Sequence, residues 1–151
     1  MKYFMILLLL SNYCIGQKVT YDHSDTISIA KNSLYSNAKL WLLTTTNKPV
    51  DIDDSIQLTG NSSFIFKFNS GLKNNICRCV YSIRIDLGEN KYKIQFYNIF
   101  ISFSPGYETP IEELKAKFGK EIYKKITGQI GRKMLAMIDD FTHAINKPNS
   151  L

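Results

Sequence analysis

Residues 76–87, ICRCVYSIRIDL, alternate between apolar and polar side chains along one predicted strand. Successive side chains of a strand point to opposite faces, so this pattern buries one face and leaves the other in water. Such alternation is typical of an antiparallel sheet with one solvated face. We expect the buried face to carry Cys77, Cys79, Tyr81, Ile83 and Ile85, and the wet face to carry Arg78, Ser82, Arg84 and Asp86.

Three more strands are predicted around this one. Residues 52–58 form a weakly patterned strand that ends at a Gly60-Asn61 turn, and residues 63–69 (SFIFKFN) place three Phe side chains on one face. Residues 91–103 follow a hairpin turn at residues 88–90 and change phase midway. A bulge near Tyr97-Asn98 would return both halves of that strand to the core, and the alternative is a strand end buried on both faces. Residues 104–106 (SPG) should end the sheet.

One helix is predicted before these strands in the chain and another after them. Residues 18–23 form a first strand, and residues 28–45 form a helix with an apolar stripe at spacings of three and four. Thr109 and Glu112 suggest a capping box at the start of a C-terminal helix that runs to Ile145. This helix is either continuous or kinked at Gly119. The order is therefore β-α-β-β-β-β-α in one α+β domain, an antiparallel sheet with the long helix packed on one face.

Composition and charge limit the function. The chain has 151 residues, 44% of them apolar and 13% aromatic, which is typical of one globular domain. Its formal net charge of +6 favours acidic partners, and contact with an anionic membrane surface stays an open alternative. The basic residues look scattered and interleaved with acids. An ordinary solvated surface is therefore the simpler interpretation.

Residues 1–16 are predicted to be a secretory signal. Met1-Lys2 provides a positive start, residues 3–10 (YFMILLLL) are apolar, and the run is too short to span a bilayer. We place cleavage between Gly16 and Gln17, which leaves residues 17–151 as the mature domain, periplasmic or secreted. A buried N-terminal strand is the alternative. Lipid attachment at Cys14 is disfavoured because bulky Tyr13 precedes it.

No catalytic or metal-binding residues are predicted. Neighbours in the run Asp22-His23-Ser24-Asp25 point to opposite faces of a strand, so they cannot form a nucleophile–base–orienter line. Cys77 and Cys79 share one face, and we interpret them as small core hydrophobes rather than a disulfide or metal ligands. No cofactor is predicted.

Several stretches resemble a known family. Residues 34–42 (LYSNAKLWL) are similar to a first-helix pattern of Leu-Tyr, then Ala, then Trp, in a domain-of-unknown-function family described as having a TBP-like fold. The Gly60-Asn61 step into a Phe-rich strand, the Tyr-rich last strand and the helix entry at residues 110–114 (PIEEL) are also similar. The family occurs in exported proteins of Bacteroidota. The resemblance implies a TBP-like fold and an exported setting, with no activity or functional residue to transfer.

Ligand or partner binding without catalysis is the favoured function. A sheet closed by a long helix leaves a concave apolar site, and tyrosines near its rim offer a polar tip. We expect a cavity between sheet and helix, lined by the Ile122–Ile138 stripe and by candidate binding residues Phe64, Phe66, Tyr81 and Tyr97, with Tyr107 as a further candidate. The alternative is an envelope hydrolase with an unrecognised site. Nucleic acid is not an expected partner, because a shared fold does not imply a shared function.

Overall fold

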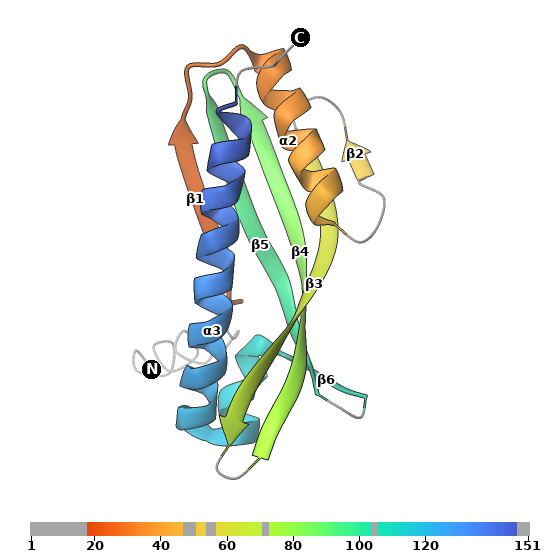
Figure 1. The fold of residues 1–151 in the computed structure, drawn as a ribbon, viewed down its shortest axis with the longest axis vertical. Helices are drawn as coiled ribbons and strands as arrows, with labels where there is room; N and C mark the ends of the chain where they lie inside the picture. Colours follow the sequence, from red (N-terminus) through yellow and green to blue (C-terminus); the bar gives the residue numbers. More distant parts are fainter. Residues whose placement is uncertain (1–17, 47–50, 54–56, 71–72, 104–105, 148–151) are drawn as a thin grey trace, which may run out of the picture.

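The computed structural model describes residues 18–46, 51–53, 57–70, 73–103 and 106–147 (Figure 1). The strands form one antiparallel sheet in the order β1-β5-β4-β3-β2, and β6 pairs with β5. This confirms the predicted α+β class, with a helix after the first strand and a long C-terminal helix. The elements are β1 (Tyr21–Thr26), α2 (Lys31–Thr45), β2 (Asp51–Asp53), β3 (Gln57–Ser70), β4 (Lys73–Gly88), β5 (Lys91–Phe103), β6 (Tyr107–Pro110), the 3-10 turn η2 (Ile111–Glu113) and α3 (Leu114–Ile145).

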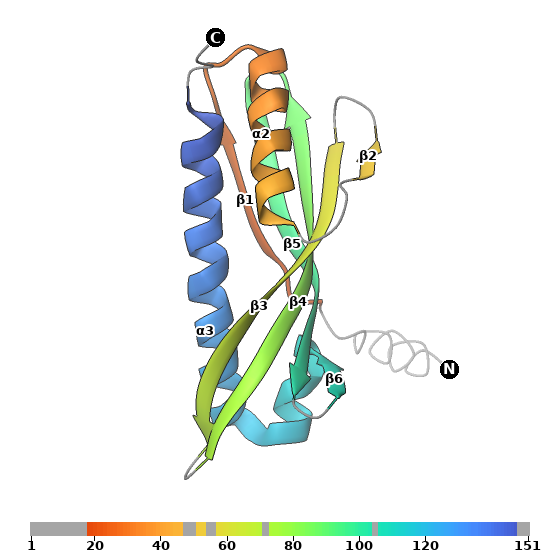
Figure 2. The same ribbon diagram turned by 45° about the vertical axis from the view of Figure 1, so that its right-hand side comes forward.

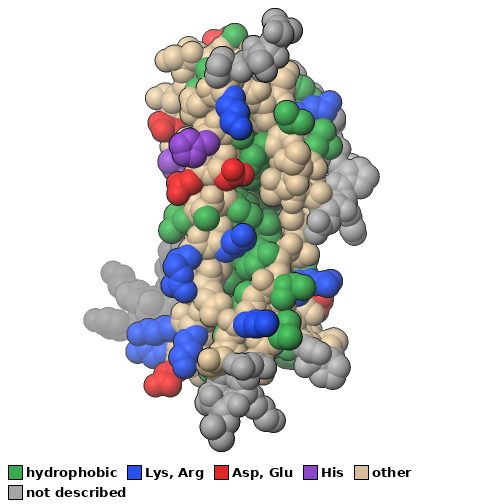
Figure 3. Space-filling view, in the orientation of Figure 1, with side chains coloured by type: hydrophobic (Ala, Val, Ile, Leu, Met, Phe, Trp, Pro, Cys, Tyr) green, Lys and Arg blue, Asp and Glu red, His purple; other side chains and the backbone are tan. Residues whose placement is uncertain are grey.

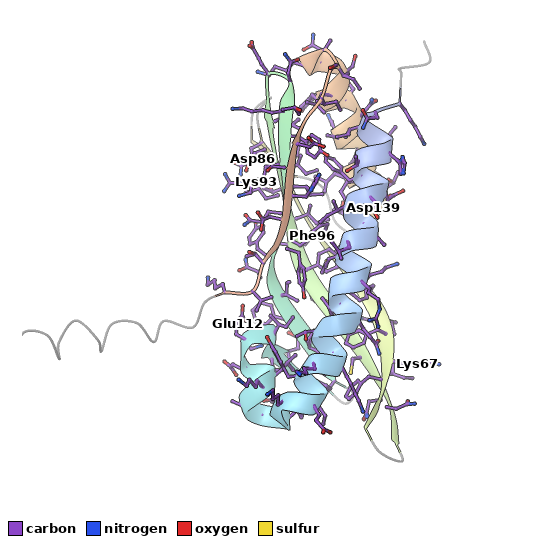
Figure 4. All side chains as sticks on the ribbon, turned by 90° about the vertical axis from the view of Figure 1, so that its left-hand side faces the viewer. Lys67, Asp86, Lys93, Phe96, Glu112 and Asp139 are labelled. Carbon is purple, nitrogen blue, oxygen red and sulfur yellow. The ribbon has the colours of Figure 1, made fainter. Side chains whose placement is uncertain are left out.

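The molecule has two layers, with both helices on the same face of the twisted sheet (Figures 1 and 2). The central strand β4 follows the predicted alternation. Its inward side chains are at most 2% exposed, from Cys77 to Ile85. Phe96 of β5 projects from the sheet toward α3 and is fully buried (Figure 4). The hydrophobic core therefore lies between the sheet and the helices.

The predicted bulge in β5 is confirmed. The register of β4 against β5 shifts between Val80 and Ser82, opposite the phase change, and Asn98 has a positive φ of 50°. Because of this extra residue, Phe96 and Ile99 both point into the core and are at most 2% exposed. The alternative of a strand end buried on both faces is wrong, since Phe100 remains 39% exposed.

The sheet differs from the prediction near β2 and β3. Residues 52–58 do not form one strand, because Ile52 of β2 pairs with Leu58 of β3 and the segment turns back on itself. The predicted turn at Gly60-Asn61 is wrong, since β3 continues through it. A Cβ on Gly60 would lie 2.6 Å from Thr46 Cγ2. The glycine there allows the end of α2 to approach the sheet closely.

The ends of the sheet also differ from the prediction. The first strand begins at Tyr21 rather than residue 18, and the sheet continues beyond residues 104–106 as the short strand β6. Thr109 pairs with Ile101 inside that strand and does not cap a helix. Glu112 Oε1 instead accepts a hydrogen bond from the Val19 backbone N–H at 2.7 Å. The predicted capping box is therefore wrong, because strand pairing already holds Thr109.

The C-terminal helix is kinked, as one of the two alternatives predicted. Gly119 has φ 81° and ψ 169°, which is far from helical geometry and almost confined to glycine. Beyond the kink, the stripe from Ile126 to Ile145 is buried on the sheet. No helix in the described ranges is long and apolar enough to cross a membrane.

The two helices contact each other through side chains near the C-terminal end of α3. Trp41 Nε1 donates to Asp140 Oδ2 at 2.8 Å, and the Trp41 ring meets Phe141 edge-on at a centroid distance of 4.9 Å. Asn37 Nδ2 donates to the backbone oxygens of Ile145 and Lys147. The predicted apolar stripe of the first helix is buried here, at Leu34, Ala38, Trp41 and Leu42.

Candidate functional site

Three of the predicted binding residues lie together on the inner face of the sheet. The Phe64 ring is 6.1 Å from that of Phe66 and 5.8 Å from that of Tyr81. The Tyr81 hydroxyl donates to Met137 Sδ at 3.2 Å. Burial raises the pKa of Tyr81, with a hydrogen bond to Ser62 acting in the opposite direction. Tyr81 is only 2% exposed, so it acts as a packed core residue beneath the two Phe rings.

The other two predicted residues lie elsewhere. Tyr97 pairs with Ser82, whose side chain points away from the helices, so it lies on the opposite face from Tyr81. Tyr107 is on β6, 47% exposed, with Lys117 Nζ 5.0 Å from its ring centroid. The structure therefore brings Phe64, Phe66 and Tyr81 together and leaves Tyr97 and Tyr107 apart from them.

The predicted cavity between α3 and the sheet is occupied by side chains. Ile130 and Met134 are fully buried there, and Ile138 is 5% exposed. They belong to one hydrophobic cluster with Tyr81 and Phe96. A hollow bounded by α3 lies instead at the edge of β3.

The two cysteines pack in the core, as predicted. Both are free and buried, and burial raises the pKa of Cys77 to about 11 and that of Cys79 to about 12. Thiols with such pKa values are protonated near neutral pH and are poor nucleophiles.

The run Asp22-His23-Ser24-Asp25 lies within the edge strand β1. Asp22 forms a 4.0 Å ion pair with Lys93, and His23 is tilted against the ring of Tyr92. Their side chains alternate between the faces, so they do not converge on one point. Across the described residues, no group of three or more His, Cys, Asp or Glu is arranged to hold a metal.

An open groove separates the lower part of β3 from α3, and we call it the β3–α3 groove. It consists of two adjoining hollows of about 410 and 470 Å³ that share Gln129 and Arg132. The strand provides Phe64 and Phe66 as an apolar floor. The full lining is residues 64–69 of β3 with Lys124, Lys125, Gly128, Gln129, Arg132, Lys133 and Ala136 of α3.

Positive charge surrounds this groove. Its lining contains five cations and no acid: Lys67, Lys124, Lys125, Arg132 and Lys133. All five are exposed, and within the described residues none of them has an ion-pair partner. Figure 3 shows an apolar strip with Lys and Arg on both sides. In Figure 4, Lys67 projects from the lower part of β3, while Asp139 lies well above it on α3.

The excess charge of the chain lies on the first part of α3, and four of the seven cations there line this groove. Residues 114–133 hold seven Lys or Arg and one acid, Glu121, whereas the rest of the chain holds twelve of each sign. The net charge of +6 therefore comes from the first part of α3. The interpretation of scattered charge was wrong, and a count over a twenty-residue window would have found the run.

The edge of β3 is open along the groove. β2 pairs only with residues 57–59 of β3, and in the described part of the chain no strand pairs with that side below Thr59. The end of α2 covers β3 near Gly60 and Ser62, where Ser62 Oγ donates to the Thr45 oxygen. Below that point, residues 64–69 face the groove. An open edge leaves alternate backbone N–H and C=O groups available for hydrogen bonds.

Two other hollows have a weaker concentration of charge in their linings. One of about 510 Å³ surrounds the β4–β5 hairpin, where Asp25 and Asp86 stand beside Lys91 and Lys93, so its charges are mixed. Another of about 470 Å³ lies at the bulge, beside Arg78 and Phe100. The first has mixed charges, and the second has one cation, Arg78, against the five of the β3–α3 groove.

Fold and groove together define an α+β domain of TBP-like fold that carries an open basic groove at one sheet edge. No family model and no curated protein matches the chain. Two solved structures are similar: a TBP-like protein from Parabacteroides distasonis (TM-score 0.61, 15% identity, covering 84% of this chain and 94% of that one) and a DUF4468 family protein from Bacteroides ovatus (TM-score 0.60, 16% identity, covering 89% and 90%). At these identities the likeness shows the fold, and it confirms the TBP-like fold that the sequence resemblance implied.

Proposed function

We propose that this protein is a non-enzymatic binding domain, and that the β3–α3 groove binds an anionic ligand or partner. The observation that carries the proposal is the set of five cations around an apolar floor, with no acid in the lining. A cleft lined by one sign of charge, with low-dielectric walls, focuses the field and raises the local concentration of counter-ions. Phe64 and Phe66 would add apolar contact to this attraction.

The groove chemistry favours binding over catalysis. The groove lining presents Lys and Arg side chains with no carboxylate, imidazole or thiol among them, so it offers positive charge without a candidate general base. The nearby thiol of Cys79 is buried and protonated. The envelope hydrolase stays an alternative from the sequence analysis, with no observation in the groove that favours it.

Export is part of the same proposal. Residues 1–16 and the cleavage position between Gly16 and Gln17 lie outside the described residues, which begin at Lys18. Their charge and apolar pattern support a signal that leaves residues 17–151 as one domain. Intact mass measurement of the protein expressed in a bacterial host, from periplasm and cytoplasm separately, tests this. A mature mass beginning at Gln17 in the periplasm supports export, and a full-length cytoplasmic chain contradicts it.

Binding is tested with a fluorescein-labelled poly-glutamate peptide and fluorescence anisotropy. The double variant Lys125→Gln, Arg132→Gln removes two groove cations, and Lys18→Gln, Lys31→Gln removes two exposed cations elsewhere as a matched control. We expect saturable binding that weakens with added NaCl, is lost largely in the groove variant, and is retained in the control. Equal binding by all three proteins would contradict the proposed site.

A further inference from the structure

Resting on the proposed function, the geometry points to one class of partner: an extended acidic polypeptide segment that adds as a strand to the open edge of β3. Residues 64–69 provide the edge, and the flank of α3 from Lys124 to Ala136 provides the opposite wall. Strand addition uses backbone hydrogen bonds for affinity and side-chain pockets for specificity. The groove offers both in one place.

The dimensions of the two walls agree. Six residues of extended strand span about 20 Å. The thirteen helical residues 124–136 rise by about 20 Å along the axis of α3. An extended segment paired with residues 64–69 would therefore lie along the whole basic section of the helix.

The spacing of the cations selects an alternating sequence. Alternate side chains of a strand lie on one face about 7 Å apart. Lys125 and Lys133 lie about two turns apart on α3, separated by about 12 Å along the axis with the neutral Gln129 between them, which is close to the spacing of about 14 Å between strand residues four apart. Asp or Glu at every second position would thus face the helix wall. Lys67 is exposed at the lower end of β3 and, like Ile65, belongs to the outward positions of the strand, so it lies near the end of the segment without facing these acids.

Apolar contacts support the same orientation. Phe64 is half-buried and Phe66 is 9% exposed, so both rings still present an edge to the groove. Ile65 points to the other face of the sheet and is 64% exposed at the rim. An added strand would cover part of this apolar surface while keeping its acids against α3. A polyanion without a peptide backbone cannot pair with the edge of β3 as a strand.

The test compares four probes on the full mature chain by isothermal titration calorimetry. They are a short peptide of alternating Glu and Thr, two forms of it with N-methyl groups on alternate backbone nitrogens along one edge or the other, and an oligothymidylate. N-methylation removes backbone donors and leaves the charge unchanged. Both edge-methylated peptides are used, so that one of them lacks the N–H groups on the edge that would pair with β3. We expect the unmodified peptide to bind at least ten-fold more tightly than the weaker methylated form and than the oligothymidylate.

The outcomes separate the two proposals. Equal affinity for all four probes, lost in Lys125→Gln, Arg132→Gln, would overturn strand addition and leave anion binding at the groove intact. Tighter binding of the oligothymidylate would indicate a nucleic-acid site and also overturn it. No binding of any probe would overturn both proposals. Lys18→Gln, Lys31→Gln is the control throughout, and far-UV circular dichroism checks that each exposed variant is folded.

Discussion

Two glycines of α3 allow the same substitution to have opposite effects on stability. Gly119 has φ 81°, and a Cβ added there would have no atom beyond its chain neighbours within 4 Å, so an alanine meets no clash but must adopt a strained backbone. That strain costs about 1–3 kcal/mol. Gly128 lies within the regular helix, and its added Cβ would contact only Arg132 Nη1, at 3.9 Å. Alanine there should stabilise the helix by about 0.5–1 kcal/mol.

Urea unfolding followed by circular dichroism at 222 nm measures both changes. We expect Gly119→Ala to lower the free energy of unfolding and Gly128→Ala to raise it, a difference of about 1.5–4 kcal/mol between the two variants. Because both add one methyl group to the same helix, differences in hydrophobicity cancel. Equal effects of the same sign would refute the kink at Gly119 and the regular helix at Gly128.

Two further predictions concern the core. Burial raises the pKa of the Cys79 thiol from about 9 to about 12, so the unfolded chain loses this proton at a lower pH than the folded protein does. The free energy of unfolding should therefore fall above about pH 9, by up to about 1.4 kcal/mol per pH unit. Urea midpoints measured across that range should fall less steeply for Cys79→Ala than for the unchanged protein, and identical slopes would contradict the burial of this thiol. Trp41→Phe should cost about 2 kcal/mol, of which about 1 kcal/mol is the hydrogen bond to Asp140. A double-mutant cycle with Asp140→Ala isolates that bond, and a coupling energy near zero would contradict it.

The parts of the fold that could be predicted are those set by periodicity. The alternation around Cys79 and Ile83 requires a strand with one buried face, and the phase change at Asn98 requires a bulge if both halves are to reach the core. The stripe of the first helix likewise identified its buried residues. In each case one regular element buries one face, so local spacing carries the information.

The parts that could not be predicted depend on contacts between distant segments. Gly60 was interpreted as a turn residue, whereas its lack of a side chain serves the approach of Thr46. Thr109 and Glu112 match a capping box in sequence, yet pairing with Ile101 and a hydrogen bond from Val19 engage them instead. Where a short residue pattern is compatible with two local structures, contacts with distant parts of the chain determine which of them forms.

The candidate site was only partly visible in the sequence. Phe64 and Phe66 were identified as binding residues, and they do form the groove floor. The open edge of β3 could not be predicted, because it depends on how short β2 is. The basic wall could have been predicted, since the excess of Lys and Arg on residues 114–133 is continuous along the chain.

The most direct test of the binding groove is an NMR titration of the isotope-labelled mature chain with the alternating Glu–Thr peptide. We expect saturable chemical-shift changes in the amides of residues 64–69 and 124–133, because these form the two walls of the groove. Amides near Arg84 and Lys93, on the outer face of the sheet, should stay unchanged. Chemical-shift changes confined to that outer face, with the groove amides unaffected, would contradict binding at the β3–α3 groove.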